Sequence, residues 1–188
     1  MTRSLSHVVG FDDAPFASGH RGNVLVVGAV FAGTRLDGVV SCQVGRDGAN
    51  ATAALTDCIR GSRYFRQLHA VLLQGIAFAG FNVVDLPMLH ASLRLPVLVV
   101  SRRRPNLATI RAALLGPVPG GVRKWKLIEE AGPMEPTAGL YVQRAGITPE
   151  EARSLLQRLA VNGALPEPLR VAHLIAGGIA RGQSSGRP

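Results

Sequence analysis

Cysteine is scarce in this chain of 188 residues, and Cys42 and Cys58 do not form a CxxC pair. Two thiols at this spacing exclude a disulfide framework and a zinc site built on thiolates, so we expect buried free thiols. Apolar runs of ~18 residues, the length of a membrane-spanning helix, are also absent. Asp12 and Asp13 interrupt the N-terminal region before any stretch that suits a signal sequence. These absences predict a cytoplasmic protein without a membrane partner.

Lysine is almost absent as well, because Lys124 and Lys126 are the only two. Lys and Arg together still number 21 against 12 Asp and Glu, which gives a formal net charge of +9. Such an excess favours an anionic partner such as nucleic acid, although an arginine bias also reflects a GC-rich genome. Hydrophobic residues make up 47% of the chain, which excludes a wholly disordered protein. We therefore expect one globular domain over residues 1–188, without internal repeats.

Short apolar runs alternate with helical patterns along the chain. This order predicts an α/β fold whose later strands pair in parallel. A stretch rich in Gly and Pro, about 116–138, is interpreted as an inserted loop or hairpin. Thr148, Pro149 and Glu151 supply a capping box at the start of one helix. Strands are predicted at 6–11, 24–33, 38–45, 69–74, 96–101 and 139–143, and helices at 49–59, 83–93, 106–115, 148–161 and 169–180.

Two adjacent carboxylates, Asp12 and Asp13, follow the first predicted strand. Acids at the carboxyl ends of strands in open α/β sheets face the crevice where ligands bind. Consecutive strand residues point to opposite faces, so only one of the pair aims into a given site, and we prefer Asp12. The alternative is that both are turn residues or helix caps.

The segment LLQGIAFAGFNVVDL (72–86) places Gln74 at a strand end, two glycines in the following loop, and Asn82 and Asp85 beyond it. Glycines there let backbone approach a ligand or a neighbouring strand closely. Neither GxGxxG nor GxxxxGK[ST] is present, so dinucleotide and P-loop sites lose their main support. Asp85 is either a site residue or an ordinary carboxylate at a helix start.

Glu167, Arg170 and His173 lie at offsets of three, which puts an acid, a cation and a base on one side of a helix. A lone helical histidine is also compatible with a surface or core role. Two basic clusters suit phosphate contacts, the second with a tryptophan on which a base could stack, although both also suit a solvated face. The first cluster is Arg102, Arg103 and Arg104; the second is Arg123, Lys124, Trp125 and Lys126.

Several of these segments together resemble the endonuclease dU family, a distant relative of endonuclease V. The resemblance implies a ribonuclease-H-like fold, with a mixed five-stranded sheet flanked by helices. It also implies a Mg²⁺- or Mn²⁺-dependent hydrolase that cleaves a DNA phosphodiester near a deaminated base such as deoxyuridine, which is extruded into a pocket. The segments are FDDAPF (11–16), LLQGIAFAGFNVVDL, SRRRPNL (101–107), GLYVQRAGIT (139–148) and PEPLRVAHLIAGGIARG (166–182).

Within this resemblance Asp12 matches the first-strand metal ligand, with Asp13 beside it. Gln74 stands where the family's LDG pattern has aspartate, and Gln183 where its GES pattern has glutamate. Each amide offers an oxygen ligand without negative charge, so affinity for a hard cation should fall. Asp13, Asp85 or Glu167 could supply the carboxylate that Gln74 and Gln183 lack. The resemblance thus implies Asp12, Asp13, Asp85 and Gln74 as catalytic residues, with Asp12, Asp13 and Gln74 as metal ligands.

Three functions remain open at the level of sequence. The first is a metal-dependent endonuclease of DNA or RNA that uses Asp12. The second is a degenerate relative that binds nucleic acid without cutting it, because Gln74 and Gln183 replace acids. The third is a protein that binds a nucleotide or another small molecule in the same crevice, because fold does not fix chemistry. The oligomeric state is open as well.

Overall fold

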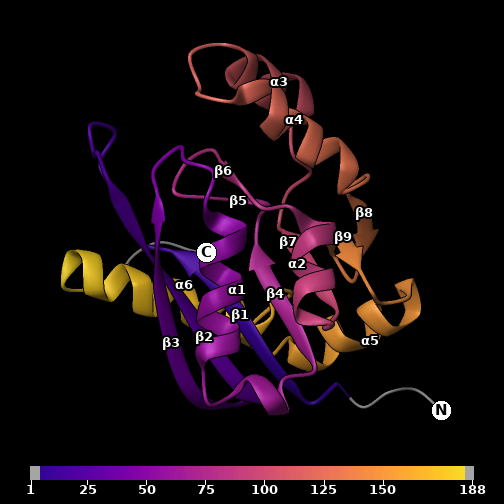
Figure 1. The fold of residues 1–188 in the computed structure, drawn as a ribbon. Coiled ribbons are helices and arrows are strands. Elements are labelled where there is room, and N and C mark those ends of the chain that lie inside the picture. The colour runs from indigo at the N-terminus through magenta and orange to yellow at the C-terminus, as the bar shows by residue number, and fades with distance from the viewer. Residues whose placement is uncertain (1–4, 185–188) are drawn as a thin grey trace.

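A seven-stranded mixed sheet forms the centre of the protein (Figure 1). The computed structural model describes residues 5–184. The strands run through apolar, β-branched segments, and their pairing order joins residues that are far apart in sequence. In spatial order they are β3 (Arg35–Gly45), β2 (Asn23–Ala32), β1 (His7–Asp13), β4 (Ala70–Gln74), β7 (Val97–Ser101), β9 (Leu140–Ala145) and β8 (Glu135–Thr137).

The three central strands, β1, β4 and β7, pair in parallel, whereas the strands on either side pair antiparallel. In the β1–β4 ladder Phe11 lies opposite Leu73, so Asp12 and Gln74 come one step later on neighbouring strands. Parallel strands end at the same edge of a sheet. The carboxyl ends of β1, β4 and β7 therefore form one edge, and Asp12, Asp13 and Gln74 all belong to it.

Helices cover both faces of the sheet (Figure 1). Because side chains alternate along each strand, Phe11 packs into the core under α1 and α2, while Val8 packs into the core under α5 and α6. A short 3₁₀ helix, Phe65–Gln67, precedes β4. The four covering helices are α1 (Ala51–Gly61), α2 (Leu86–Leu93), α5 (Pro149–Leu159) and α6 (Glu167–Arg181).

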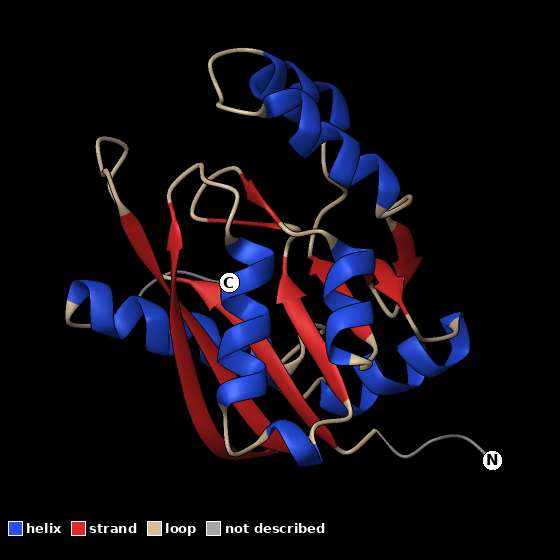
Figure 2. Ribbon diagram, in the orientation of Figure 1, coloured by secondary structure: helices blue, strands red, loops and turns tan. Residues whose placement is uncertain are grey.

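Two further helices, α3 (Leu107–Leu115) and α4 (Gly121–Glu130), form a pair that extends beyond the carboxyl edge of the parallel strands (Figure 2). The pair is tight at its turn, because a Cβ on Gly121 would lie 1.6 Å from the carbonyl oxygen of Leu114. Below it, β5 (Ala77–Phe78) and β6 (Asn82–Val83) make a small hairpin.

The α/β fold expected from the sequence is confirmed, although the sheet has seven strands rather than five because β9 and β8 extend it beyond β7. The stretch 116–138, expected as a loop or hairpin, contains α4 and β8. Its glycines and prolines end α3 and begin α4, and Ile128 on the apolar side of α4 packs against Val83 and Leu114. Cys42 and Cys58 are partly rather than fully buried, and both are free. No helix within residues 5–184 is long and apolar enough to cross a membrane.

Candidate active site at the carboxyl edge of the parallel strands

The two aspartates at the end of β1 point to opposite faces of the sheet. β1 runs through Asp13, so both residues belong to the strand rather than to the loop after it. Asp12 is only 6% exposed, and its Oδ2 lies 2.8 Å from Nδ1 of His173 on α6. Asp13 faces the other way, and its Oδ2 accepts a hydrogen bond of 2.6 Å from the peptide N–H of Ala79. Asp12 is therefore the carboxylate that meets α6.

Burial raises the pKa of Asp12 to about 7, and the negative charge of Asp13 adds to this increase. The hydrogen bond and the charge of His173 act in the opposite direction, as does the peptide N–H of Asp13, which donates to Oδ1 at 3.0 Å. Burial also raises the pKa of Asp13. A carboxyl group that exchanges its proton near neutral pH, beside a histidine, is typical of catalytic sites.

A close approach of α6 to β1 brings His173 to Asp12. A Cβ on Gly10 would lie 2.6 Å from the carbonyl carbon of Pro168, so only glycine fits under the first turn of the helix. His173 is more accessible than its partner, with 25% of its side chain exposed against 9% for Asp12. Because Nδ1 faces Asp12, the other ring nitrogen of His173 remains available to a ligand.

Glu167 and Arg170 fix the beginning of α6 rather than join this pair. Glu167 accepts hydrogen bonds from Arg170 at 2.9 and 2.8 Å and from Asn162 at 2.9 Å. The hydrogen bond from Arg170 lowers the pKa of Glu167. The helix therefore contributes its histidine to the site, and its acid to an ion pair.

Gln74 lies beside Asp12 on the neighbouring strand, and its side chain amide oxygen is buried without a hydrogen-bond partner among the described residues. Asp12 and Gln74 follow the paired residues Phe11 and Leu73, so their side chains point to the same face of the sheet. A buried oxygen without a donor is the kind of atom that a cation or a water would satisfy. Mg²⁺ is commonly held by one or two carboxylates together with substrate phosphates, so Asp12 and Gln74 fit such an ion.

Asp85 and Asn82 have structural contacts elsewhere. Asp85 is the N-cap of α2, and its Oδ1 accepts a hydrogen bond from the peptide N–H of Met88 at 2.9 Å. Asn82 is 0% exposed and links Ala51 to Gly45 by side-chain hydrogen bonds. Within residues 5–184, no three His, Cys, Asp or Glu side chains form a group that could hold a metal ion. The predicted acids therefore do not converge on Asp12.

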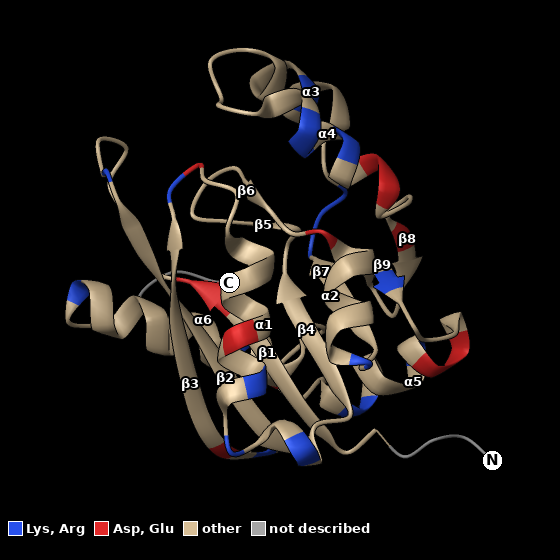
Figure 3. Ribbon diagram, in the orientation of Figure 1, with Lys and Arg blue, Asp and Glu red and all other residues tan. Residues whose placement is uncertain are grey.

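The first basic cluster, Arg102–Arg104, is exposed and follows β7 at the same edge (Figure 3). Arg102 has interactions with other parts of the protein. Beyond α6, Gln183 is exposed and follows the helix C-cap Gly182. The three arginines after β7 place positive charge beside the strand ends.

The second basic cluster, on α4, is divided by its neighbours. Arg123 is exposed, Lys124 is buried, and Lys126 pairs with Glu130 at 3.6 Å. The indole N–H of Trp125 donates to Glu129 at 2.7 Å, and the guanidinium of Arg111 lies 5.9 Å from the ring centroid. Because the cluster is divided in this way, its four residues do not form one continuous basic face.

A pocket of about 240 Å³ opens at the same edge, between the β5–β6 hairpin, α3, α4 and β9. Its walls are largely apolar and include Phe81 and Ile110. Gln143 on β9 lines the pocket; its side-chain N–H donates to the carbonyl oxygen of Gly132 at 2.6 Å, and its amide oxygen is buried without a partner among residues 5–184. Gln143 was not identified from the sequence as a site residue. A polar residue at the end of the otherwise apolar run GLYVQ could have indicated one.

Relatives and solved structures resemble the whole chain. A UPF0215 protein of Deinococcus radiodurans is 60% identical over 183 residues, which cover 97% of this chain and 93% of that protein. The crystal structure of a protein of unknown function from Archaeoglobus fulgidus superposes with a TM-score of 0.86 at 32% identity, covering 92% of this chain and 97% of that one.

Endonuclease V of Ciona intestinalis, solved in complex with a 24mer DNA that contains inosine, superposes with a TM-score of 0.56 at 12% identity, covering 90% of this chain and 83% of that one. This similarity shows that the chain has the ribonuclease-H-like fold of endonuclease V. The family model described as Endonuclease dU matches residues 4–180. The chain belongs to the endonuclease dU family.

Proposed function

We propose that this protein is a metal-dependent endonuclease that hydrolyses a DNA phosphodiester near a deaminated base. The observation that carries the proposal is the buried Asp12–His173 pair at the carboxyl edge of β1, with the amide oxygen of Gln74 beside it. Membership of the endonuclease dU family supports the same activity. The DNA in the endonuclease V complex, solved on the same fold, supports nucleic acid as the partner.

The Asp12–His173 pair would orient the reacting water and receive its proton. The carboxylate of Asp12 holds the imidazole through Nδ1 at 2.8 Å, which leaves Nε2 to accept a proton from the attacking water. Solvent reaches His173 but hardly reaches Asp12, so the histidine is the member that faces the substrate.

Asp12 and Gln74 would hold the divalent cation, Mg²⁺ or Mn²⁺, because they offer oxygen atoms on adjacent strands. When bound, such an ion neutralises charge on the phosphate and lowers the pKa of a water. The exposed arginines after β7 would hold the neighbouring phosphates of the strand.

The pocket of about 240 Å³ would accept the extruded base. Deamination changes a ring nitrogen from an acceptor to a donor, since uracil carries N3–H where cytosine has a lone pair, and hypoxanthine carries N1–H where adenine has one. The unpartnered amide oxygen of Gln143 would accept a hydrogen bond from that N–H. An undeaminated base would instead present a second acceptor, which costs binding free energy.

Cleavage of end-labelled oligonucleotides tests this proposal. Oligonucleotides that contain one deoxyuridine or deoxyinosine should be cut with Mg²⁺ or Mn²⁺ faster than matched oligonucleotides with deoxycytidine or deoxyadenosine. Gln143→Met keeps the side-chain volume and removes the acceptor, so it should reduce this preference roughly tenfold. Equal cleavage of all four substrates by the wild type would remove the deaminated base from the proposal.

A second function is a protein that binds nucleic acid without cutting it, and Gln74 favours it. An amide in place of a carboxylate leaves Asp12 as the acidic member of the two proposed ligands, which weakens a hard-cation site. In that case the wild type should bind oligonucleotides in a salt-dependent manner without cutting them, and Gln74→Asp should gain Mn²⁺ binding. Metal-dependent cleavage by the wild type would exclude this function.

A further inference from the structure

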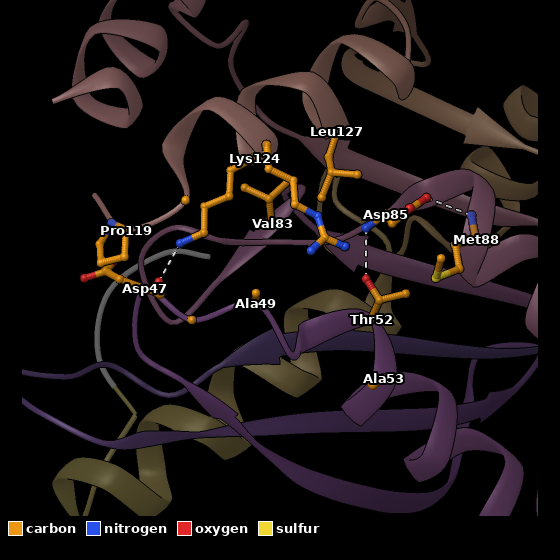
Figure 4. A pocket seen from close by; sticks show the side chains of 13 residues that line it. Asp47, Ala49, Thr52, Ala53, Val83, Asp85, Met88, Pro119, Lys124 and Leu127 are labelled. Carbon is orange, nitrogen blue, oxygen red and sulfur yellow. Dashed lines mark hydrogen bonds between the residues drawn. The ribbon is translucent and has the colours of Figure 1, made fainter. Parts of the chain in front are cut away.

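A second and larger pocket, of about 430 Å³, adjoins the first one at Val83, which lines both (Figure 4). Its walls come from α4, the turn after β3, and the first turns of α1 and α2. The volume lies within the range of about 300–1,000 Å³ that is typical of small-molecule sites. None of the proposed catalytic contacts with Asp12 uses this pocket.

Lys124 supplies a buried positive charge to this pocket. The residue is 4% exposed, and its ammonium donates to the carbonyl oxygen of Asp47 at 2.5 Å (Figure 4). No carboxylate oxygen of residues 5–184 lies within 4.0 Å of Nζ, and burial lowers the pKa of the lysine. A buried ammonium without an ion-pair partner is unusual, because buried charges are normally paired.

The charge of Asp47, the nearest acid, raises the pKa of Lys124, but its carboxylate forms no ion pair with the lysine. Oδ1 of Asp47 accepts a hydrogen bond of 2.8 Å from the peptide N–H of Phe81, and Oδ2 lies 3.4 Å from the guanidinium of Arg46. One carboxylate oxygen of Asp47 therefore holds the β5–β6 hairpin, and the other forms an ion pair with Arg46. Asp47 and Asp85 also line the pocket, so an anionic ligand would have to contact Lys124 away from these two carboxylates.

Other residues of the pocket suit a phosphate ester with an apolar part. Arg123, next to Lys124, lines the pocket and is exposed, without a hydrogen bond or ion pair to the rest of residues 5–184. Thr52 lies in the first turn of α1, a helix of eleven residues whose positive end faces the pocket. Val83 and Leu127 provide an apolar wall opposite these polar groups.

Two hydrogen bonds connect this pocket to Asp13 at the end of β1. The peptide N–H of Asp47 donates to the carbonyl oxygen of Ala79 at 2.9 Å, and the N–H of Ala79 donates to Asp13 at 2.6 Å. The same loop residue therefore contacts the pocket wall on one side and the end of β1 on the other. The pocket is therefore linked to Asp13, which is next to Asp12 in β1 but points to the opposite face of the sheet.

We propose that this pocket binds a nucleotide, with its phosphate at Lys124 and Arg123 and its sugar and base against Val83 and Leu127. The inference rests on the proposed function in one respect, namely that the nucleotide belongs to a strand whose neighbouring phosphodiester reaches Asp12. The same chemistry also fits a free nucleoside monophosphate, and the experiment separates the two sources.

The test measures binding without a divalent cation, so that a protein that never cuts still gives an answer. Fluorescence anisotropy would follow a labelled single-stranded oligodeoxynucleotide over a series of salt concentrations, and calorimetry would follow deoxyuridine monophosphate alone. Lys124→Met removes the charge and keeps the buried aliphatic chain, and Arg123→Gln does the same at an exposed position that cannot unfold the core. Lys126→Met is the matched control, because this lysine lies on the same helix and pairs with Glu130.

Lys124→Met and Arg123→Gln should each raise the dissociation constant of the oligonucleotide roughly tenfold. Each should also reduce the slope of log affinity against log salt by about 0.7, the value for one phosphate contact to a single strand. If deoxyuridine monophosphate binds the wild type and is lost in both variants, the ligand is a free nucleotide; if only the oligonucleotide responds, it is a strand. Effects no larger than that of Lys126→Met, on both ligands, would overturn the proposal.

Discussion

At the scale of single residues, the proposed site depends on the burial of one carboxylate. Asp12 could be chosen from the sequence because it ends an apolar strand, and strand alternation correctly separated it from Asp13. His173 could be named, but its partner could not, because the contact joins residues that are 161 apart in the chain. Gln143 and Asp47 were missed because their roles depend on pockets that form only when distant elements meet.

The buried charge of Asp12 should cost stability. Its pKa is raised to about 7, so the ionised form is disfavoured in the folded protein relative to the unfolded chain. Asp12→Asn keeps an oxygen for the peptide N–H of Asp13 and removes that cost. The variant should be more stable by about 1–2 kcal/mol in thermal melts at pH 8. Asp57→Asn, at an exposed position of α1, is the control and should change the melting temperature little; a variant at position 12 that melts below the wild type would contradict this account.

Glu167 should stabilise the protein in a pH-dependent manner. Its pKa is lowered, first by the hydrogen bond from Arg170, so the ionised form is favoured in the folded state. The stabilisation is therefore present above the ordinary value of 4.5 and is lost as the pH falls through the lower pKa of the folded protein. Glu167→Gln should lower stability by about 1–3 kcal/mol at pH 7. Denaturant unfolding at several pH values should show the two proteins converging in acid; a constant difference would exclude the ion pair as the cause.

At the scale of elements, the close packing of α6 on β1 positions the histidine. The capping box of α5 was readable from Thr148 and Glu151, and it is present. The start of α2 was placed too early in the sequence, because residues 82–83 pair with β5 and Asp85 is the cap. α4 was hidden by the glycines and prolines that flank it. Local patterns thus predict elements, whereas the distance between α6 and β1 follows from one glycine.

Gly10→Ala should separate these two elements. The new methyl group would lie 2.6 Å from the backbone of Pro168, which cannot move without the helix. We expect a loss of about 1–3 kcal/mol of stability, together with a weaker Asp12–His173 contact. Thermal unfolding and the NMR signal of His173 would measure the two effects. Gly19→Ala, where no atom lies within 4 Å of the new Cβ, should be nearly neutral; equal effects at both positions would show that the contact is not tight.

At the scale of the whole molecule, charge and topology act together at one edge. The +9 charge is spread over several elements, but the arginines after β7 stand beside the strand ends that carry Asp12 and Gln74 (Figure 3). Composition could predict an anionic partner, and the order of strands and helices could predict the α/β fold. Neither could show that Lys124 is buried and Lys126 exposed, because that depends on how α4 packs against the rest of the molecule.

Arg103→Gln combined with Arg104→Gln should weaken the binding of every oligonucleotide to a similar degree. Phosphate contacts carry no sequence information, so the preference for a deaminated base should persist while the salt slope for single strands falls by about 1.4. Anisotropy titrations over a range of salt concentrations measure this slope. The matched double variant, Arg60→Gln with Arg66→Gln, removes the same charge at the opposite edge of the sheet and should change the slope far less. Equal slopes for the two double variants would show that net charge alone governs binding.

The most direct measurement is single-turnover cleavage, in Mn²⁺, of an oligonucleotide that contains one deoxyuridine, by the wild type and by Asp12→Asn. Enzyme in excess of substrate reports the hydrolytic step itself. We predict cleavage by the wild type and a rate at least about 100-fold lower for the variant, because the asparagine can neither bind the ion as an anion nor share a proton with His173. Equal rates for the two folded proteins would contradict the assignment of Asp12 as the centre of the active site.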